Sequence, residues 1–170
     1  EHVHQSWLHL LPTAQGLTSG GVLHALDVGA GSGRDARFLA AKGFHVIAVE
    51  PADALRELAI ELTAQSHNAH AIQFLADELP ALPQVQARHQ PFELVLLSAV
   101  WMHLTHEQRA AALPTLCKLL APQGLLVLTL RHGSFSDGRE AYPVSTAEIE
   151  ALISQQQLPL TPVLMTELVK

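Results

Sequence analysis

The sequence predicts an α/β fold in which helices cover both faces of a mostly parallel sheet. Short apolar runs alternate with helix-like segments along the chain, which is the pattern of successive βαβ units. The runs are almost continuously apolar, as in Leu94-Val95-Leu96-Leu97, and this is typical of strands that are buried on both faces. One run ends directly on a glycine-rich loop, Gly29-Ala30-Gly31-Ser32-Gly33, and a helix-like segment follows it at once.

These patterns predict the elements in chain order. An apolar face that includes Trp7 favours a short amphipathic helix over residues 4–11, which Pro12 ends. Strands are expected at 23–28, 44–49, 71–75, 93–98 and 124–130, and helices at 34–42, 52–66, 106–121 and 146–156. Three prolines predict a loop with a brief helical turn between the third and fourth strands. The apolar residues from Leu160 to Val169 have room for one more strand.

Composition narrows the class of protein. The 170 residues suffice to bury a core, so one domain over 1–170 is expected, with no internal disulfide because Cys117 is the only cysteine. We expect a cytoplasmic protein, because no apolar run is long enough to cross a bilayer and no secretion signal precedes the first strand. The net charge of −6 and the scattered basic residues argue against a nucleic-acid partner. The eleven histidines lack Cys or Glu companions at a recognised spacing, so no metal site is expected.

The glycine-rich loop is the clearest sign of a ligand site. Its glycines permit backbone angles and close approaches that a Cβ would prevent, and the helix after it directs unpaired N–H groups toward the loop. A dinucleotide-binding loop would need a third glycine where Arg34 stands. Asp27, inside the preceding strand, would repel a pyrophosphate, and it suits either the N–H groups of the loop or a cationic ligand group. Both residues argue against NAD.

Two further acids follow the second and third predicted strands. Glu50 stands where a carboxylate can accept both hydroxyls of a ribose, and Pro51 keeps its backbone extended. Asp77 stands where it can accept from an exocyclic amine such as adenine N6. Because such strand ends meet at one crevice of an open α/β sheet, the acids suit a ligand with an amine, a ribose and an adenine.

On these residues the chain resembles the class I S-adenosylmethionine-dependent methyltransferases. The matching segments cover about residues 22–131 in the family's order and spacing: LDVGAGSGRDARFLAAKGFHVIAVEPADALRELA, FLADELPAL, FELVLLSAVWMHL and LCKLLAPQGLLVLTL. The resemblance implies a Rossmann-like fold, S-adenosylmethionine as cofactor and S-adenosylhomocysteine as product. It places the methionine part at Asp27, Gly29, Ala30, Gly31 and Gly33, the ribose at Glu50 and Pro51, the adenine at Asp77, Glu78 and Leu79, and the sulfonium beside Ser98, Ala99 and Val100.

The chain departs from the family's pattern in three places. The family often has Asp where Glu93 stands and a Gly-Gly pair where Gln123-Gly124 stands, and neither change touches the cofactor. The family's sheet has seven strands, the last two forming an antiparallel edge hairpin, and this chain has room for one of them. The C-terminal hairpin is therefore expected to be incomplete, either because the domain is truncated or because an open edge pairs in a homodimer.

The catalytic residues have weaker signals. If the methyl acceptor is a hydroxyl or an ammonium, a base must take its proton. His103, just after the fourth strand, is the first candidate for this base, with a capping or packing role as the alternative, and His132 is the second. Arg131, Arg139 and Tyr142 lie in a polar loop after the fifth strand, where they are candidates to bind the substrate. Two arginines suit a carboxylate or a phosphate.

Three functions are therefore compared. The first is S-adenosylmethionine-dependent methyl transfer to a small-molecule acceptor, an acceptor class inferred from the chain's acidity and size. The second is a non-catalytic cofactor-binding or protein-partner module, since a fold does not fix a function. The third, a nicotinamide-dependent oxidoreductase, is disfavoured by Arg34 and Asp27.

Overall fold

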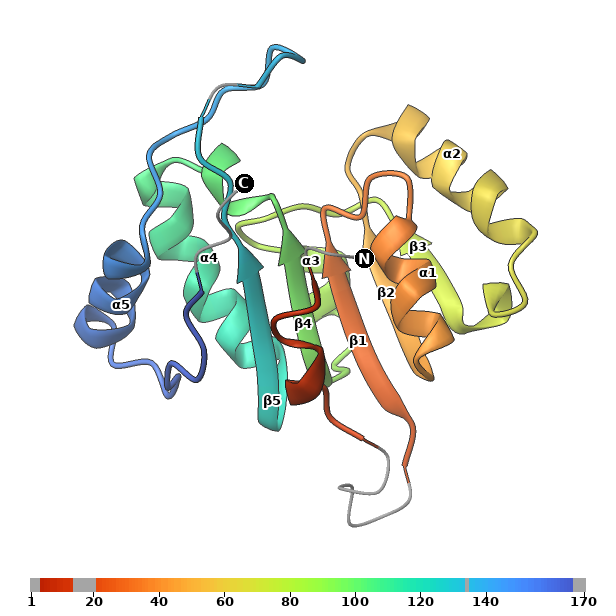
Figure 1. The fold of residues 1–170 in the computed structure, drawn as a ribbon, viewed down its shortest axis with the longest axis horizontal. Coiled ribbons are helices and arrows are strands. Elements are labelled where there is room, and N and C mark those ends of the chain that lie inside the picture. The colour runs from red at the N-terminus through yellow and green to blue at the C-terminus, as the bar shows by residue number, and fades with distance from the viewer. Residues whose placement is uncertain (1–3, 14–20, 134, 167–170) are drawn as a thin grey trace.

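The computed structural model describes residues 4–13, 21–133 and 135–166, and its centre is a five-stranded sheet (Figure 1). The strands lie in the order β3-β2-β1-β4-β5, and every neighbouring pair runs parallel. Their bounds are β1 Leu23–Val28, β2 Phe44–Val49, β3 Ile72–Leu75, β4 Phe92–Ser98 and β5 Leu120–Thr129. The predicted α/β fold and its five parallel strands are confirmed.

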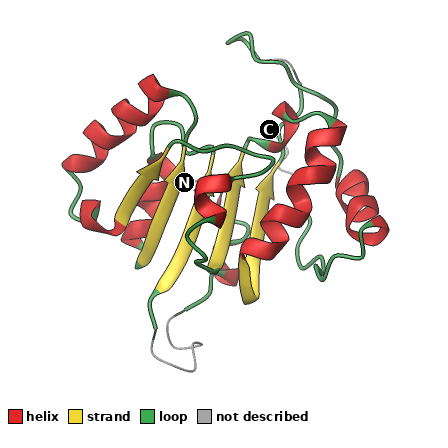
Figure 2. Ribbon diagram, turned by 180° about the vertical axis from the view of Figure 1, so that it is seen from behind, coloured by secondary structure: helices red, strands yellow, loops and turns green. Residues whose placement is uncertain are grey.

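Helices lie on both faces of this sheet (Figures 1 and 2). They are α1 Arg34–Ala41, α2 Asp53–Ala64, α3 Pro83–Gln86, α4 His106–Leu119 and α5 Thr146–Gln155, with short 3-10 turns η2 Leu8–Leu10, η4 Ala69–Ala71 and η5 Trp101–His103. Local chemistry fixes where α4 and α5 begin. Thr105 and Gln108 cap each other's backbone N–H groups at the start of α4, and the Ser145 hydroxyl accepts from the Glu148 N–H at the start of α5.

Alternate residues of the central strands supply two separate hydrophobic cores. On one face, Leu94 and Leu96 pack in the same cluster as Leu39 of α1 and Trp7 of the N-terminal segment. On the other face, Val95 and Leu97 belong to a cluster completed by α3, α4 and α5, through residues that include Val85, Leu113, Leu116 and Leu152. Burying a side chain of this size stabilises the fold by about 1.5–3 kcal/mol, so both layers hold the sheet in place.

Three predictions about element bounds are wrong. Residues 4–11 do not form an amphipathic α-helix, because their backbone bonds join residues three apart, as in the 3-10 turn Leu8–Leu10. The fifth strand begins at Leu120 and not at 124, because an irregularity lets Leu120 pair with Phe92 before Leu125 pairs with Leu94. The helix predicted to reach 121 accordingly ends at Leu119.

The strand expected between Leu160 and Val169 is also absent from the described part of that segment. Residues 160–166 form no helix or strand, and 167–170 lie outside the described residues. Pro162 lacks the N–H that a sheet ladder requires. Among the described residues, β5 pairs only with β4. None of the helices in the described ranges is long and apolar enough to span a bilayer.

Candidate cofactor site

The sheet brings the predicted ligand residues to one edge, at the carboxyl ends of its strands. β1 lies between β2 and β4: the chain runs from β1 to β2 and β3 on one side and then crosses back to β4 and β5 on the other. In open α/β sheets, the strand ends at such a switch in direction form the ligand site. The glycine-rich loop follows β1 at this point, and α1 begins immediately after it (Figure 1).

The glycines of the loop differ in what a side chain would meet at each position. Gly29 has a φ of +73°, and a Cβ there would lie 2.5 Å from Cγ2 of Val100. Gly33 has a φ of +78° and would bring a Cβ within 3.1 Å of the Phe74 ring. Around Gly31, by contrast, a Cβ would meet nothing within 4 Å, although its φ is +54°. Gly29 and Gly33 therefore allow close packing within the protein, whereas Gly31 faces open space that a ligand can occupy.

Glu50 joins the end of β2 to the glycine-rich loop. Its Oε2 accepts a hydrogen bond from the Gly31 N–H over 2.9 Å, and its Oε1 accepts from the Ala52 N–H over 3.0 Å. The Glu50 side chain is buried, whereas the following Pro51 is exposed. Each carboxylate oxygen has a second lone pair, so these bonds leave acceptor capacity for a hydroxyl of a ligand.

Asp27 is the most deeply placed acid of the site. The residue is 1% exposed, and its Oδ2 has no hydrogen-bond partner among the described residues. Burial, together with the nearby Asp35 carboxylate, raises the pKa of Asp27 to about 8. A cationic group of a ligand would supply the missing partner and favour the ionised carboxylate. This buried, unpartnered oxygen fits a ligand that carries an ammonium.

Asp35 is a third buried acid near the loop, and no pattern in the sequence indicates a role for it. His4 Nε2 lies 3.0 Å and Arg34 Nε 3.1 Å from its Oδ1. Burial acts to raise the pKa of Asp35, but these two partners outweigh it and hold the pKa well below its usual range. Asp35 is therefore a stable negative charge at the first turn of α1.

Asp77 holds the loop that joins β3 to α3. Its Oδ1 accepts from the Glu78 N–H over 3.0 Å and its Oδ2 from the Val85 N–H over 2.9 Å. The neighbouring Leu79 side chain is buried in the core, and the Glu78 side chain is exposed. As with Glu50, the predicted ligand residue also orders its own loop.

The end of β4 lies against the glycine-rich loop. Val100 is the residue that a Cβ on Gly29 would strike, as described above. Ala99 has a φ of +55°, and its N–H donates to the Thr129 hydroxyl over 2.9 Å. The structure therefore brings the stretch Ser98 to Val100 beside the loop, and Thr129 of β5 is a supporting residue for which no sequence signal was found.

The two candidate bases have different surroundings. In His103, Nδ1 lies 2.7 Å from the Glu140 carbonyl oxygen, and Nε2 is buried with no partner among the described residues. Since a carbonyl only accepts, Nδ1 carries the proton and Nε2 presents a lone pair. The Phe135 ring packs edge-on against the imidazole, with ring centroids 4.6 Å apart. His132, just after β5, is exposed.

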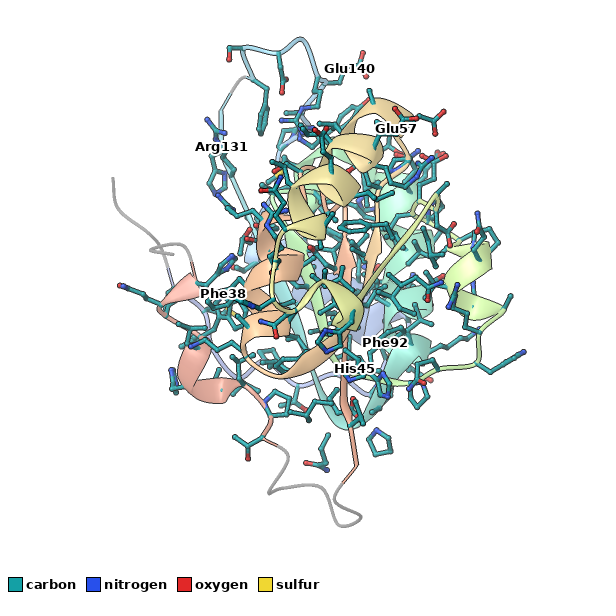
Figure 3. The ribbon with its side chains drawn as sticks, turned by 90° about the vertical axis from the view of Figure 1, so that its right-hand side faces the viewer. Phe38, His45, Glu57, Phe92, Arg131 and Glu140 are labelled. Carbon is teal, nitrogen blue, oxygen red and sulfur yellow. The ribbon has the colours of Figure 1, made fainter. Side chains whose placement is uncertain are left out.

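The predicted substrate-binding arginines gather around the same phenylalanine. The guanidinium carbons of Arg131 and Arg139 lie 5.0 and 5.2 Å from the Phe135 ring centroid. Arg139 also forms an ion pair of 2.7 Å with Asp137, and the Tyr142 hydroxyl donates to Glu140 over 2.8 Å. In Figure 3 the labelled Arg131 and Glu140 lie toward the opposite end of the molecule from His45.

Other kinds of site find little support in the described ranges. No group of three or more His, Cys, Asp or Glu side chains there could hold a metal ion. Two cavities of about 290 and 370 Å³ lie near the amino ends of the strands, beside residues such as Pro91 and Phe44, and neither includes the glycine-rich loop. Burial raises the pKa of the Cys117 thiol, which disfavours a nucleophilic role.

Comparison with known proteins identifies the family to which this chain belongs. The family model of the methyltransferase domain matches residues 25–124, which is more than half of the chain. This chain is therefore a member of the methyltransferase domain family. Among curated proteins, no sequence is significantly similar to it.

Solved structures share the fold at low sequence identity. A SAM-dependent methyltransferase from Leishmania major is 17% identical with a TM-score of 0.66, over 92% of this chain and 61% of that one. The glycopeptide N-methyltransferase MtfA, in complex with S-adenosylmethionine, is 18% identical with a TM-score of 0.56, over 64% of this chain and 47% of its own. The cyclase SpnF is 18% identical with a TM-score of 0.62, over 79% of this chain and 51% of that one. This chain thus spans about half to three fifths of their lengths.

Proposed function

We propose that this protein is an S-adenosylmethionine-dependent methyltransferase that acts on a small-molecule acceptor. The observation that carries the proposal is the set of buried acids, Asp27, Asp35 and Glu50, around a glycine-rich loop. Carboxyl groups that ionise beside a bound cation favour a ligand with an ammonium and a sulfonium and disfavour a pyrophosphate. Membership of the methyltransferase domain family supports the same cofactor.

The cofactor is assigned to the carboxyl edge of the sheet. The ammonium of its methionine part would meet Oδ2 of Asp27, with the chain from Gly29 to Gly33 against it. The ribose would bind Glu50 beside Pro51, and the adenine would bind Asp77 and the Glu78-Leu79 backbone. Ser98, Ala99 and Val100 would line the sulfonium. The open space around Gly31 and the free lone pairs of the Glu50 and Asp77 carboxylates support these assignments.

His103 is assigned the role of base. When bound, S-adenosylmethionine supplies a methyl group on a good leaving group, so the protein has to align the acceptor and take its proton. Nε2 of His103 would take that proton, because the Glu140 carbonyl keeps the ring's own proton on Nδ1. His132 remains the second candidate, and its side chain is exposed to solvent.

The acceptor is proposed to carry an acidic group. Arg131 precedes Phe135 in the sequence and Arg139 follows it, and both guanidinium groups lie over its ring. The same ring contacts His103. Guanidinium groups bind carboxylates and phosphates in a bidentate manner. A carboxylate or phosphate held there would bring a nearby hydroxyl or amine of the same molecule toward His103.

A turnover assay tests this function. The protein is incubated with S-adenosylmethionine labelled on its methyl group and with a panel of small hydroxy and amino acids, with Asp27→Asn as the control. Label transfer to at least one acceptor, lost in the control, is expected. Calorimetric binding of S-adenosylhomocysteine without transfer to any acceptor would favour a non-catalytic module, and binding of NADH alone would favour an oxidoreductase.

A further inference from the structure

Arg109 is a buried cation at the junction of three segments. The residue is 1% exposed, although it lies in the first turns of α4 within a polar run of the sequence. Its Nε donates to the Trp101 carbonyl of η5 over 3.1 Å. Its Nη1 donates to the Pro143 carbonyl over 2.8 Å and to Oε2 of Glu148, in α5, over 2.9 Å. One side chain therefore ties η5 and α5 to the end of the loop after β5.

The segment that Arg109 holds is the segment that orients His103. The Tyr142 N–H donates to the Met102 carbonyl over 2.8 Å, which fastens the loop to η5. Two residues earlier in the loop, the Glu140 carbonyl lies 2.7 Å from Nδ1 of His103. The position of that carbonyl depends on the path of residues 140–143, and Arg109 fixes the far end of this path through the Pro143 carbonyl.

We propose that Arg109 is a positioning residue that sets the tautomer of His103. With Arg109 in place, the Glu140 carbonyl accepts the Nδ1 proton and leaves the Nε2 lone pair free. Without it, residues 140–143 keep the Tyr142–Met102 bond but lose the anchor at Pro143, the Glu140 carbonyl moves away from Nδ1, and the proton redistributes to Nε2 as in a solvated imidazole. The tautomer follows from the geometry alone, whereas its value for proton transfer rests on the proposed methyltransferase function.

A purely structural role for Arg109 makes a different prediction. In that case the ion pair with Glu148 would only hold α5 against α4, and any other contact between these helices would matter equally. Gln156 provides the matched control, because its Nε2 donates to the Ala110 carbonyl over 2.7 Å and also ties α5 to α4. No contact of Gln156 reaches Tyr142 or Pro143 among the hydrogen bonds of the described residues.

The experiment measures the imidazole nitrogen shifts of His103 by NMR on protein labelled with nitrogen-15 at pH 8. His103→Gln assigns the signals. We expect the wild type and Gln156→Ala to have a protonated Nδ1, and Arg109→Lys to shift the tautomer ratio several-fold toward a protonated Nε2. If Arg109→Lys does not fold, Glu148→Gln, which weakens the same anchor, replaces it with the same expected direction.

Two results would overturn the proposal: a wild-type His103 protonated on Nε2, or a folded Arg109 or Glu148 variant that keeps the wild-type ratio. An equal shift in Gln156→Ala would also overturn it, because the effect would then belong to helix packing. Calorimetry with S-adenosylhomocysteine on the same samples separates the two proposals. Retained binding with an unchanged tautomer refutes the role of Arg109 and leaves the proposed cofactor site standing.

Discussion

Oε2 of Glu50 accepts a hydrogen bond from the Gly31 N–H over 2.9 Å, so the acid that ends β2 supports the loop that ends β1. The other oxygen of the same carboxylate accepts from the Ala52 N–H, at the start of α2. Glu50 itself is only 7% exposed, and both bonds are partly buried. The residue assigned to the ribose therefore also fixes the shape of the surface on which the cofactor would lie.

Glu50→Ala is expected to reduce both stability and ligand binding. The substitution leaves two backbone N–H groups without their acceptor, which costs about 1–3 kcal/mol of unfolding free energy. The affinity for S-adenosylhomocysteine should fall at least about tenfold, since this corresponds to about 1.4 kcal/mol. Urea unfolding and calorimetry measure the two effects. Glu57→Ala, at an exposed site of α2 labelled in Figure 3, is the control and should change neither.

Asp27→Asn is expected to stabilise the ligand-free protein at high pH. The pKa of Asp27 is raised from 3.8 to about 8, so between these pH values the folded protein keeps a proton that the unfolded chain has lost. The wild-type protein therefore loses unfolding free energy as the pH rises, and the full cost of burying the ionised Asp27 carboxylate is present above pH 8. The variant should exceed the wild type by at least about 1.4 kcal/mol at pH 9, the equivalent of one pKa unit.

Unfolding at pH 4, 7 and 9 measures this difference. The gain should shrink toward pH 4, where the wild-type carboxyl is largely protonated in the folded state and partly so in the unfolded chain. A variant that is less stable than the wild type at pH 9 would contradict the burial of an unpartnered acid at this position.

Gly29 and Gly31 are expected to respond differently to alanine. Gly29→Ala places a Cβ 2.5 Å from Val100, so it should destabilise the fold, and adding Val100→Ala should restore part of the loss. Gly31→Ala meets no atom within 4 Å and should cost only about 1–2 kcal/mol for its left-handed backbone. Its methyl group should nevertheless obstruct the ligand. Thermal unfolding and calorimetry compare the variants, and unchanged binding by Gly31→Ala would place the ligand elsewhere.

Arg131→Gln is expected to weaken selection for acidic acceptors. Removing one of the two guanidinium groups at Phe135 should raise KM for a carboxylate acceptor by about tenfold and leave its neutral amide analogue unaffected, because a charge-assisted hydrogen bond contributes about 1.5–3 kcal/mol. Steady-state kinetics with both acceptors measures the difference. Arg88→Gln, an exposed site that bonds Gln73 far from this loop, is the control. Equal KM changes for acid and amide would argue against an acidic acceptor.

The sequence predicted the sheet and the edge at which the acids meet because those features follow from local patterns. A run such as Leu94 to Leu97 is buried on both faces of any parallel sheet, and parallel strands place Asp27, Glu50 and Asp77 at the same edge. The segment after Leu160 has room for a strand but forms none within the described residues, because an apolar run does not specify a pairing partner.

Long-range contacts account for what the sequence did not predict. Arg109 lies in a polar stretch typical of an exposed helix, and its bonds to Pro143 and Glu148, 34 and 39 residues away, help to explain its burial. Likewise, His4 reaches Asp35 through the fold of the N-terminal segment onto α1, which no spacing in the sequence indicates. Such partners become visible only when the elements are placed in space.

The most direct test of the cofactor site is the proton balance of ligand binding. S-adenosylhomocysteine is titrated by calorimetry at pH 7 in two buffers that differ in ionisation enthalpy, with wild type and Asp27→Asn. Because Asp27 is mostly protonated at pH 7 and an ammonium would ionise it, sub-millimolar binding that releases nearly one proton is expected, with the release absent in the variant. Absence of binding, or binding of equal strength and proton balance in both proteins, would contradict the assignment of this loop as the S-adenosylmethionine site.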